Sequence, residues 1–181
     1  EMFPVSNPTM TAGDIVSVDA GVPVSMKLAV AGDGAPLAGV ISTTPGQVLG
    51  DQNATGERPI ALSGRVPAKV NLEGGPISIG DRIAVSSVPG VGKKATPFDD
   101  SVGNAIDTFG ETSKDPLTGV GTVMVFLDLQ KGIDTDAIGR KLLGITATST
   151  PGIPFDFVGG MMDAITGRLA ALSGASSTTD G

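Results

Sequence analysis

The chain has 181 residues, of which 40% are hydrophobic, and it carries a net charge of −7 with a pI near 4.4. It contains no His and no Cys, which excludes Ser-His and Cys-His nucleophile pairs, zinc sites built from those ligands, and disulfides. The acidic balance argues against a nucleic-acid partner, and no apolar run approaches the roughly 18 residues of a membrane span.

The chain is predicted to begin with an extended lead-in over residues 1–12, because Pro4 and Pro8 restrict the backbone there. Short apolar runs follow, separated by Gly- and Pro-containing turns and by polar loops at 44–58 and 107–118. The predicted strands are 15–18, 22–30, 37–42, 60–62, 65–70, 77–79, 82–86 and 121–129. The last of these is apolar on both faces at its centre, which indicates a central strand.

A short motif occurs twice. The residues GDIVSV at 13–18 recur as GDRIAV at 80–85, and a second glycine follows each copy, Gly39 in one and Gly103 in the other. This predicts two pseudo-repeats, at about 13–43 and 80–108. Asp14 and Asp81 hold equivalent places, and we expect both carboxylates to accept backbone N–H bonds in the turns after Gly13 and Gly80.

These patterns predict a mainly β fold: a duplicated, short-strand antiparallel barrel or sandwich, β-clip-like, over residues 1–131. With aromatics at only 3%, and 27 Gly and 13 Pro, the core must come from aliphatic side chains, and the chain suits many short strands.

The character of the sequence changes after residue 131. Residues 132–155 are predicted to be a short helix and a linker, 156–174 an amphipathic helix, and 175–181 a disordered tail. Apolar residues in the amphipathic helix fall at spacings of 4, 3, 4 and 3, as in a heptad seam. This stripe could pack on the β domain of its own chain, or it could mediate oligomerisation; the residues concerned are Val158, Met162, Ile165, Leu169 and Leu172.

Three segments resemble ligand sites. Residues 87–94 are close to a phosphate-binding loop, but Ser87 and Lys94 stand where glycine and Ser/Thr are required, so a Pro-Gly hairpin followed by a solvated lysine pair is the better interpretation. Residues 51–56 match the first half of a calcium loop but have Leu62 in place of the final Glu, which favours a polar surface loop and leaves calcium an open alternative. The acidic residues between Asp99 and Asp115 are interpreted as a solvated loop. We expect no cofactor and no metal.

Taken together, several motifs resemble a known module. The residues EMFP at 1–4, GVISTTPG at 39–46 and LSGRVPAKV at 62–70, with the two Gly-Asp strands, are similar to a β-rich module near the C-termini of phage tail fibres and large bacterial surface proteins. The pattern is also similar to autoprocessing intramolecular-chaperone domains and, more loosely, to small trimeric capsid-decorating proteins. The resemblance covers about residues 1–130 and implies a fibre component that is extracellular or carried on a virion, and often trimeric.

The function expected from the sequence is therefore a structural, non-enzymatic assembly module of a fibre, filament, surface appendage or virion, associating with itself as a trimer or filament. A cell surface or host surface is a further candidate partner, and no nucleic-acid partner is expected. An autoproteolytic processing or chaperone domain and a carbohydrate-binding adhesin remain as alternatives. Because the chain begins Glu-Met-Phe, it is expected to be a processed product or a fragment.

Overall fold

The computed structural model describes residues 1–43, 45–46, 48–50, 55–135 and 138. These residues form ten strands: β1 (Met2–Pro4), β2 (Ile15–Val18), β3 (Met26–Leu28), β4 (Leu37–Ile41), β5 (Glu57–Ala61), β6 (Gly64–Val70), β7 (Arg82–Val85), β8 (Gly92–Lys94), β9 (Ser101–Ala105) and β10 (Gly121–Gln130). The prediction of a mainly β fold is confirmed. Among the described residues, no helix is both long enough and apolar enough to cross a membrane.

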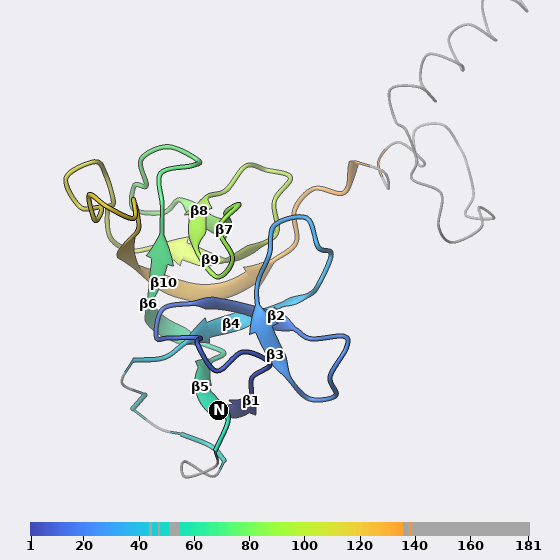
Figure 1. Ribbon diagram of the computed structural model, residues 1–181. Coiled ribbons are helices and arrows are strands. Elements are labelled where there is room, and N and C mark those ends of the chain that lie inside the picture. Colours follow the sequence, from blue (N-terminus) through green and yellow to red (C-terminus); the bar gives the residue numbers. More distant parts are fainter. Residues whose placement is uncertain (44, 47, 51–54, 136–137, 139–181) are drawn as a thin grey trace, which may run out of the picture. The chain divides into compact units, whose positions relative to one another are not determined.

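The strands form two groups of five, which Figure 1 shows as β1–β5 and β6–β10. The first group, here called unit 1, is a sheet in the order β1-β5-β4-β2-β3. The second, unit 2, is a closed barrel in the order β10-β6-β8-β7-β9. A parallel bridge between Val5 and Met26 joins the two edges of the unit 1 sheet, as the parallel pairing of Val70 with Gly92 closes the barrel. All other strand pairs are antiparallel.

The duplication is visible in individual hydrogen bonds. The Gly13 amide donates to the Ile41 carbonyl at 2.8 Å, and the Gly80 amide donates to the Ala105 carbonyl at the same distance. Both β2–β4 and β7–β9 shift register after their second residue, opposite Gly39 and Gly103. The structural repeat thus includes all five strands of each unit, more than the segments 13–43 and 80–108 that the sequence indicated.

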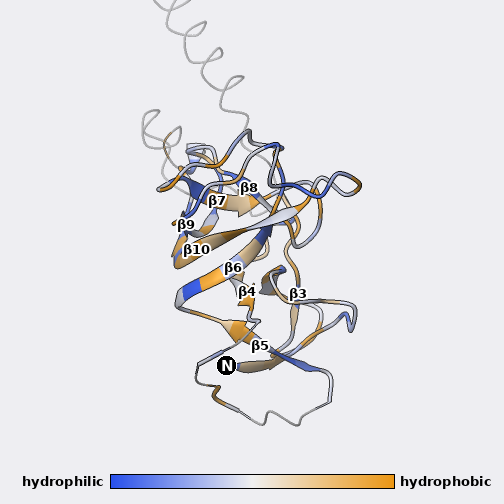
Figure 2. Ribbon diagram, turned by 90° about the vertical axis from the view of Figure 1, so that its left-hand side faces the viewer, coloured by the Kyte–Doolittle hydropathy of each residue, from blue (hydrophilic) through white to orange (hydrophobic). Residues whose placement is uncertain are grey.

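The long strands follow the period-2 rule. Along β6, Val66, Ala68 and Val70 are buried while the residues between them are more exposed, and β10 buries Val123, Val125 and Leu127. Figure 2 shows hydrophilic and hydrophobic bands side by side on β6 and a mostly hydrophobic β10. As the sequence indicated, β10 is central, because it pairs with both β6 and β9.

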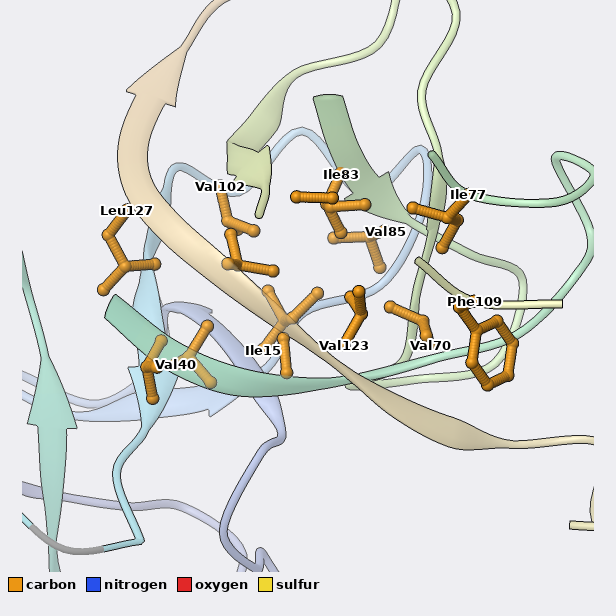
Figure 3. Close-up of a cluster of buried hydrophobic side chains, with 14 of the residues drawn as sticks. Ile15, Val40, Val70, Ile77, Ile83, Val85, Val102, Phe109, Val123 and Leu127 are labelled. Atoms are coloured by element: carbon orange, nitrogen blue, oxygen red, sulfur yellow. The ribbon is translucent and has the colours of Figure 1, made fainter. Parts of the chain in front are cut away.

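The core is aliphatic, apart from the buried ring of Phe109. Its main cluster fills the barrel and also takes in Ile15 and Val40 from unit 1. Figure 3 shows Ile15 next to Val123 of the barrel. Unit 1 has a smaller cluster of its own: Met10, Val16, Met26, Ile41 and Ile60. Because one cluster contains side chains of both units, the two share a core.

Two strand predictions are wrong in detail, and two strands were not predicted. The strand expected at 22–30 is a turn over its first half, in which the Ser25 amide donates to the Val22 carbonyl, and β3 begins only at Met26. The strand expected at 77–79 is a single bridge between Ile77 and Phe109. The lead-in includes a strand, β1, and the lysine pair lies on another, β8.

Several predicted features lie outside the described residues. They are residues 51–54 of the calcium-like loop, most of the short helix and linker, the amphipathic helix with its five stripe residues, and the C-terminal tail.

Candidate functional site

The repeated Gly-Asp turns are built alike in the two units. Gly13 and Gly80 have φ of 88° and 91°, a left-handed conformation that glycine adopts without steric cost. The Asp14 carboxylate accepts the Thr11 amide at 2.8 Å, and the Asp81 carboxylate accepts the Ser78 amide at 2.8 Å. Both carboxylates therefore close the turns in which they lie.

Each of these carboxylates also pairs with a lysine. Lys69 Nζ of β6 lies 2.6 Å from Oδ1 of Asp14, and Lys94 Nζ of β8 lies 2.8 Å from Oδ2 of Asp81. Hydrogen bonds from Lys94 and from the Ser78 amide lower the pKa of Asp81. These contacts are structural, because each carboxylate binds both an amide of its own turn and a lysine.

The segment that resembles a phosphate-binding loop forms a hairpin. The Val91 amide donates to the Val88 carbonyl at 3.1 Å, which closes the turn between β7 and β8. Glu73 accepts the Ser87 hydroxyl at 2.6 Å and the Ser87 amide at 2.8 Å, and it pairs with Lys93 at 3.0 Å. The Ser87 hydroxyl, the Ser87 amide and Lys93 together lower the pKa of Glu73 to about 2. This lysine is therefore engaged in an ion pair and is not simply solvated.

The acidic residues between Asp99 and Asp115 each contact other groups of the same chain. Asp99 accepts the Thr96 amide, Asp100 pairs with Lys131 at 2.6 Å, and Asp115 accepts the Thr118 amide at 2.8 Å. Within the part of the chain that the structure describes, no three His, Cys, Asp or Glu side chains gather closely enough to hold a metal ion.

The feature best suited to contact another molecule is an apolar groove, defined here by Val30, Pro36, Leu37, Phe98 and Leu129. It consists of two adjoining surface hollows of about 270 and 220 Å³ that share Leu37 and Asp100. Phe98 is 61% exposed and Leu129 is 47% exposed, although both are large apolar side chains. The groove draws residues from both units, β4 and its preceding loop on one side and β10 on the other.

The sequence did not identify this groove. Alternation along 121–129 placed Leu129 on the same face as Leu127, which is buried. The pairing of β10 with β9 shifts register between Leu127 and Gln130, and Leu129 instead faces outward. Phe98 lies in a loop, where no periodicity indicates which way a side chain points.

The chain matches no family model and no curated protein. Among solved structures, it is similar to the C-terminal fragment of bacteriophage phi29 gene product 12, with a TM-score of 0.48 and 15% sequence identity over 70% of this chain and 98% of that chain. It is similar to the same extent to the pre-mature form of that gene product, with a TM-score of 0.48 and 15% identity. In that case the match spans 70% of this chain but only 21% of the other.

Proposed function

We propose that this chain is a structural, non-enzymatic assembly module that associates with copies of itself, and that the apolar groove contributes to the contact. The observation that carries this proposal is the exposure of Phe98 and Leu129 on neighbouring hollows of a fold whose core is otherwise filled by buried aliphatic side chains. Exposed apolar side chains that gather in one concave place mark contact surfaces.

The energetic gain supports self-association. Fully burying a side chain of this size contributes about 1.5–3 kcal/mol, so covering what remains exposed of Phe98 and Leu129 contributes about 1 kcal/mol or more for each. In a symmetric assembly the gain is multiplied by the number of identical contacts.

The charges around the groove favour an apolar partner. Asp33 pairs with Lys27 at 2.8 Å, and Asp100 pairs with Lys131. Asp99, which also lines the groove, accepts hydrogen bonds from the amide and hydroxyl of Thr96. Because all three carboxylates already have partners within the chain, a neighbouring molecule needs to supply apolar surface and not a counter-charge. A second copy of this chain offers such surface.

The motifs that resemble fibre modules add the expectation of an extracellular or virion-borne location, and of a trimer or a filament. The five stripe residues between Val158 and Leu172 supply a further candidate contact in the C-terminal segment. These assignments are part of the same proposal.

The test compares solution masses by light scattering after size-exclusion chromatography. The double variant Phe98→Ser, Leu129→Ser is expected to shift the population towards the monomer of 18.0 kDa. The control is Leu117→Ser, which changes a side chain that is 94% exposed and lies outside the groove. If the groove variant and the control have the same mass distribution as the unchanged chain, the groove does not mediate assembly.

A further inference from the structure

The outward face of the barrel carries apolar side chains on β10 and next to it. Since the inward residues of β10 are buried, alternation places Met124 and Phe126 on the opposite face, where Phe126 is 53% exposed. Ile106, which follows β9, is 43% exposed, and its amide donates to the Met124 carbonyl at 2.8 Å. This face, here called the outer face, therefore presents apolar surface that the described part of the chain leaves open to solvent.

Two opposite charges lie beside Phe126. Arg65 of β6 is directly opposite Phe126 in the register of the barrel, and Asp128 is two residues further along β10. Paired residues, and residues two apart on one strand, share a face of a sheet. Arg65 and Asp128 are both exposed. Phe126 thus has a cation across the strands and an anion along its own strand.

Neither charge has a counter-ion among the described residues. The described lysines all form ion pairs, and Arg58 and Arg82 bond to backbone carbonyls. Within the same part of the chain, the Arg65 guanidinium makes no ion pair and no hydrogen bond. The Asp128 carboxylate accepts the Gln130 side-chain amide at 2.6 Å but pairs with no cation there. Both charges are therefore available to another molecule.

We propose that the outer face binds a second copy of the chain across a two-fold axis, with Arg65 of each copy paired with Asp128 of the other. A two-fold contact must be complementary to itself. A face with one cation and one anion beside an apolar centre meets that condition, whereas a face with charge of one sign would repel its copy. The contact uses no residue of the apolar groove, so it goes beyond the self-association proposed above.

The positions of these residues fix the axis. Paired residues lie about 4.8 Å apart across the strands, and residues two apart lie about 6.6 Å apart along a strand. Arg65 and Asp128 are therefore at similar distances from Phe126, in directions that are roughly at right angles. An axis in the plane of contact that bisects these directions, and passes beside Phe126, brings each Arg65 over the Asp128 of the other copy.

The same axis matches the apolar side chains. Ile106 is opposite Met124, so it lies diagonally across from Phe126, on the side away from the two charges. Ile106 and Phe126 therefore both lie along the axis, and each faces its own counterpart. Asn104, which pairs with Phe126 on β9, comes over Met124, whose flexible side chain can adapt. The strands of the two copies cross at about a right angle, which is one of the two ways in which sheets pack face to face.

The contact is small, since it consists of a few apolar side chains and two ion pairs. Stable interfaces bury about 1,200–2,000 Å² in total, and smaller ones are transient. The dimer is therefore expected at high protein concentration, or where another contact already holds copies close together.

The experiment is sedimentation velocity of the full chain carrying Phe98→Ser and Leu129→Ser, which removes the contact at the groove. The species that remains is expected to be a dimer, with twice the mass of 18.0 kDa. Adding Arg65→Glu or Asp128→Arg is expected to raise the dissociation constant about tenfold or more, because like charges then meet. Combining both substitutions is expected to restore the dimer, because the pairs re-form with their signs exchanged.

The control is Lys114→Glu, which changes the net charge as Arg65→Glu does but lies in the loop before β10. It should alter the dissociation constant by less than about twofold, because distant charges are screened. A groove variant that stays monomeric up to about 1 mM overturns the proposal. So does a dimer that tolerates either charge reversal, or one that the combined variant does not restore. Phe126→Ser in the otherwise unchanged chain should remove this dimer even if the groove mediates no assembly, so the two proposals fail separately.

Cross-linking tests the axis itself. Because the chain contains no Cys, one introduced cysteine per copy gives an unambiguous result. Ile106→Cys is expected to join two copies through a short bis-maleimide, because this position faces its counterpart. The control is Leu117→Cys, at a position that is 94% exposed and therefore more accessible to the reagent, but away from the outer face. Equal yields of joined chains would indicate random collisions and would overturn the two-fold arrangement.

Discussion

Lys69 and Asp14 join the two units: Nζ of Lys69, on the first strand of the barrel, lies 2.6 Å from Oδ1 of Asp14, in the turn before β2. A backbone hydrogen bond joins the same two segments: the Lys69 amide donates to the Gly13 carbonyl at 2.8 Å. In unit 2 the equivalent carboxylate, Asp81, pairs with Lys94 of its own unit. The same turn thus holds an inter-unit contact in one copy and a local one in the other.

Replacing Lys69 with Met should destabilise the protein by about 2 kcal/mol, because the Asp14 carboxylate loses its charged partner. The cost is high because the Asp14 side chain is only 10% exposed, so water cannot readily replace the lysine. The matched control is Lys94→Met, which should cost about 0–1 kcal/mol because that lysine is 39% exposed. Urea unfolding of both variants measures the difference. If the two variants lose equal stability, the Lys69–Asp14 pair between the units contributes no more than the Lys94–Asp81 pair within unit 2.

Gly39 and Gly103 are required by close backbone contact. A Cβ atom on Gly39 would lie 2.2 Å from the Ala61 carbonyl oxygen, and one on Gly103 would lie 2.1 Å from that of Phe126. Each Gly→Ala substitution should cost about 3 kcal/mol or more, since neither strand can move without breaking its pairing. The control is Gly110→Ala, where a Cβ meets nothing within 4 Å. If thermal unfolding shows that Gly110→Ala costs as much stability as the other two substitutions, close backbone contact does not explain the glycines at the register shifts.

Ser17 is fully buried, and its hydroxyl has no hydrogen-bond partner among the described residues. Its counterpart in unit 2 is Ala84, also buried. Ser17→Ala should therefore raise the free energy of unfolding by about 1 kcal/mol, because it removes an unpaired polar group without leaving a cavity. Ser86→Ala is the contrasting case: that buried hydroxyl bonds to Asn71 and Val88, and its loss should cost about 1 kcal/mol. A loss of stability in Ser17→Ala would show that this hydroxyl has a partner.

Glu73 should make stability fall in acid. Its pKa is about 2 in the folded protein, against an ordinary value of 4.5, so the unfolded chain binds the proton more tightly. Its contribution is complete above about pH 4.5 and is lost as the pH falls towards 2. Free energies of unfolding across this range should differ between the unchanged chain and Glu73→Gln by an amount that shrinks with falling pH. A constant difference would mean that Ser87 and Lys93 do not bind the ionised carboxylate preferentially.

The sequence predicted the parts of the fold that follow from local rules. Alternation located β6 and the buried face of β10, and the repeated Gly-Asp motif revealed the duplication. The apolar run at 22–30 was misleading because Pro23 and the left-handed Val24 make a turn there, and a valine carries no signal for that conformation. β8 was missed because Lys93 and Lys94 do not look like strand residues, although their ion pairs stabilise them on the barrel.

The apolar groove could not be predicted from the sequence, for a different reason. The apolar groove joins Leu37 and Leu129, which are far apart along the chain, and it depends on a register shift at the end of β10. Likewise, the hydrogen bond from Ser6 to Asp19 depends on the pairing of Val5 with Met26, which joins the two edges of the unit 1 sheet. Such juxtapositions arise only once the strands are paired.

Sedimentation velocity of the full chain across micromolar concentrations tests the proposed self-association most directly. The account predicts a species whose mass is a whole multiple of 18.0 kDa and whose fraction falls in the Phe98→Ser, Leu129→Ser variant. A single species of 18.0 kDa at every concentration would contradict it.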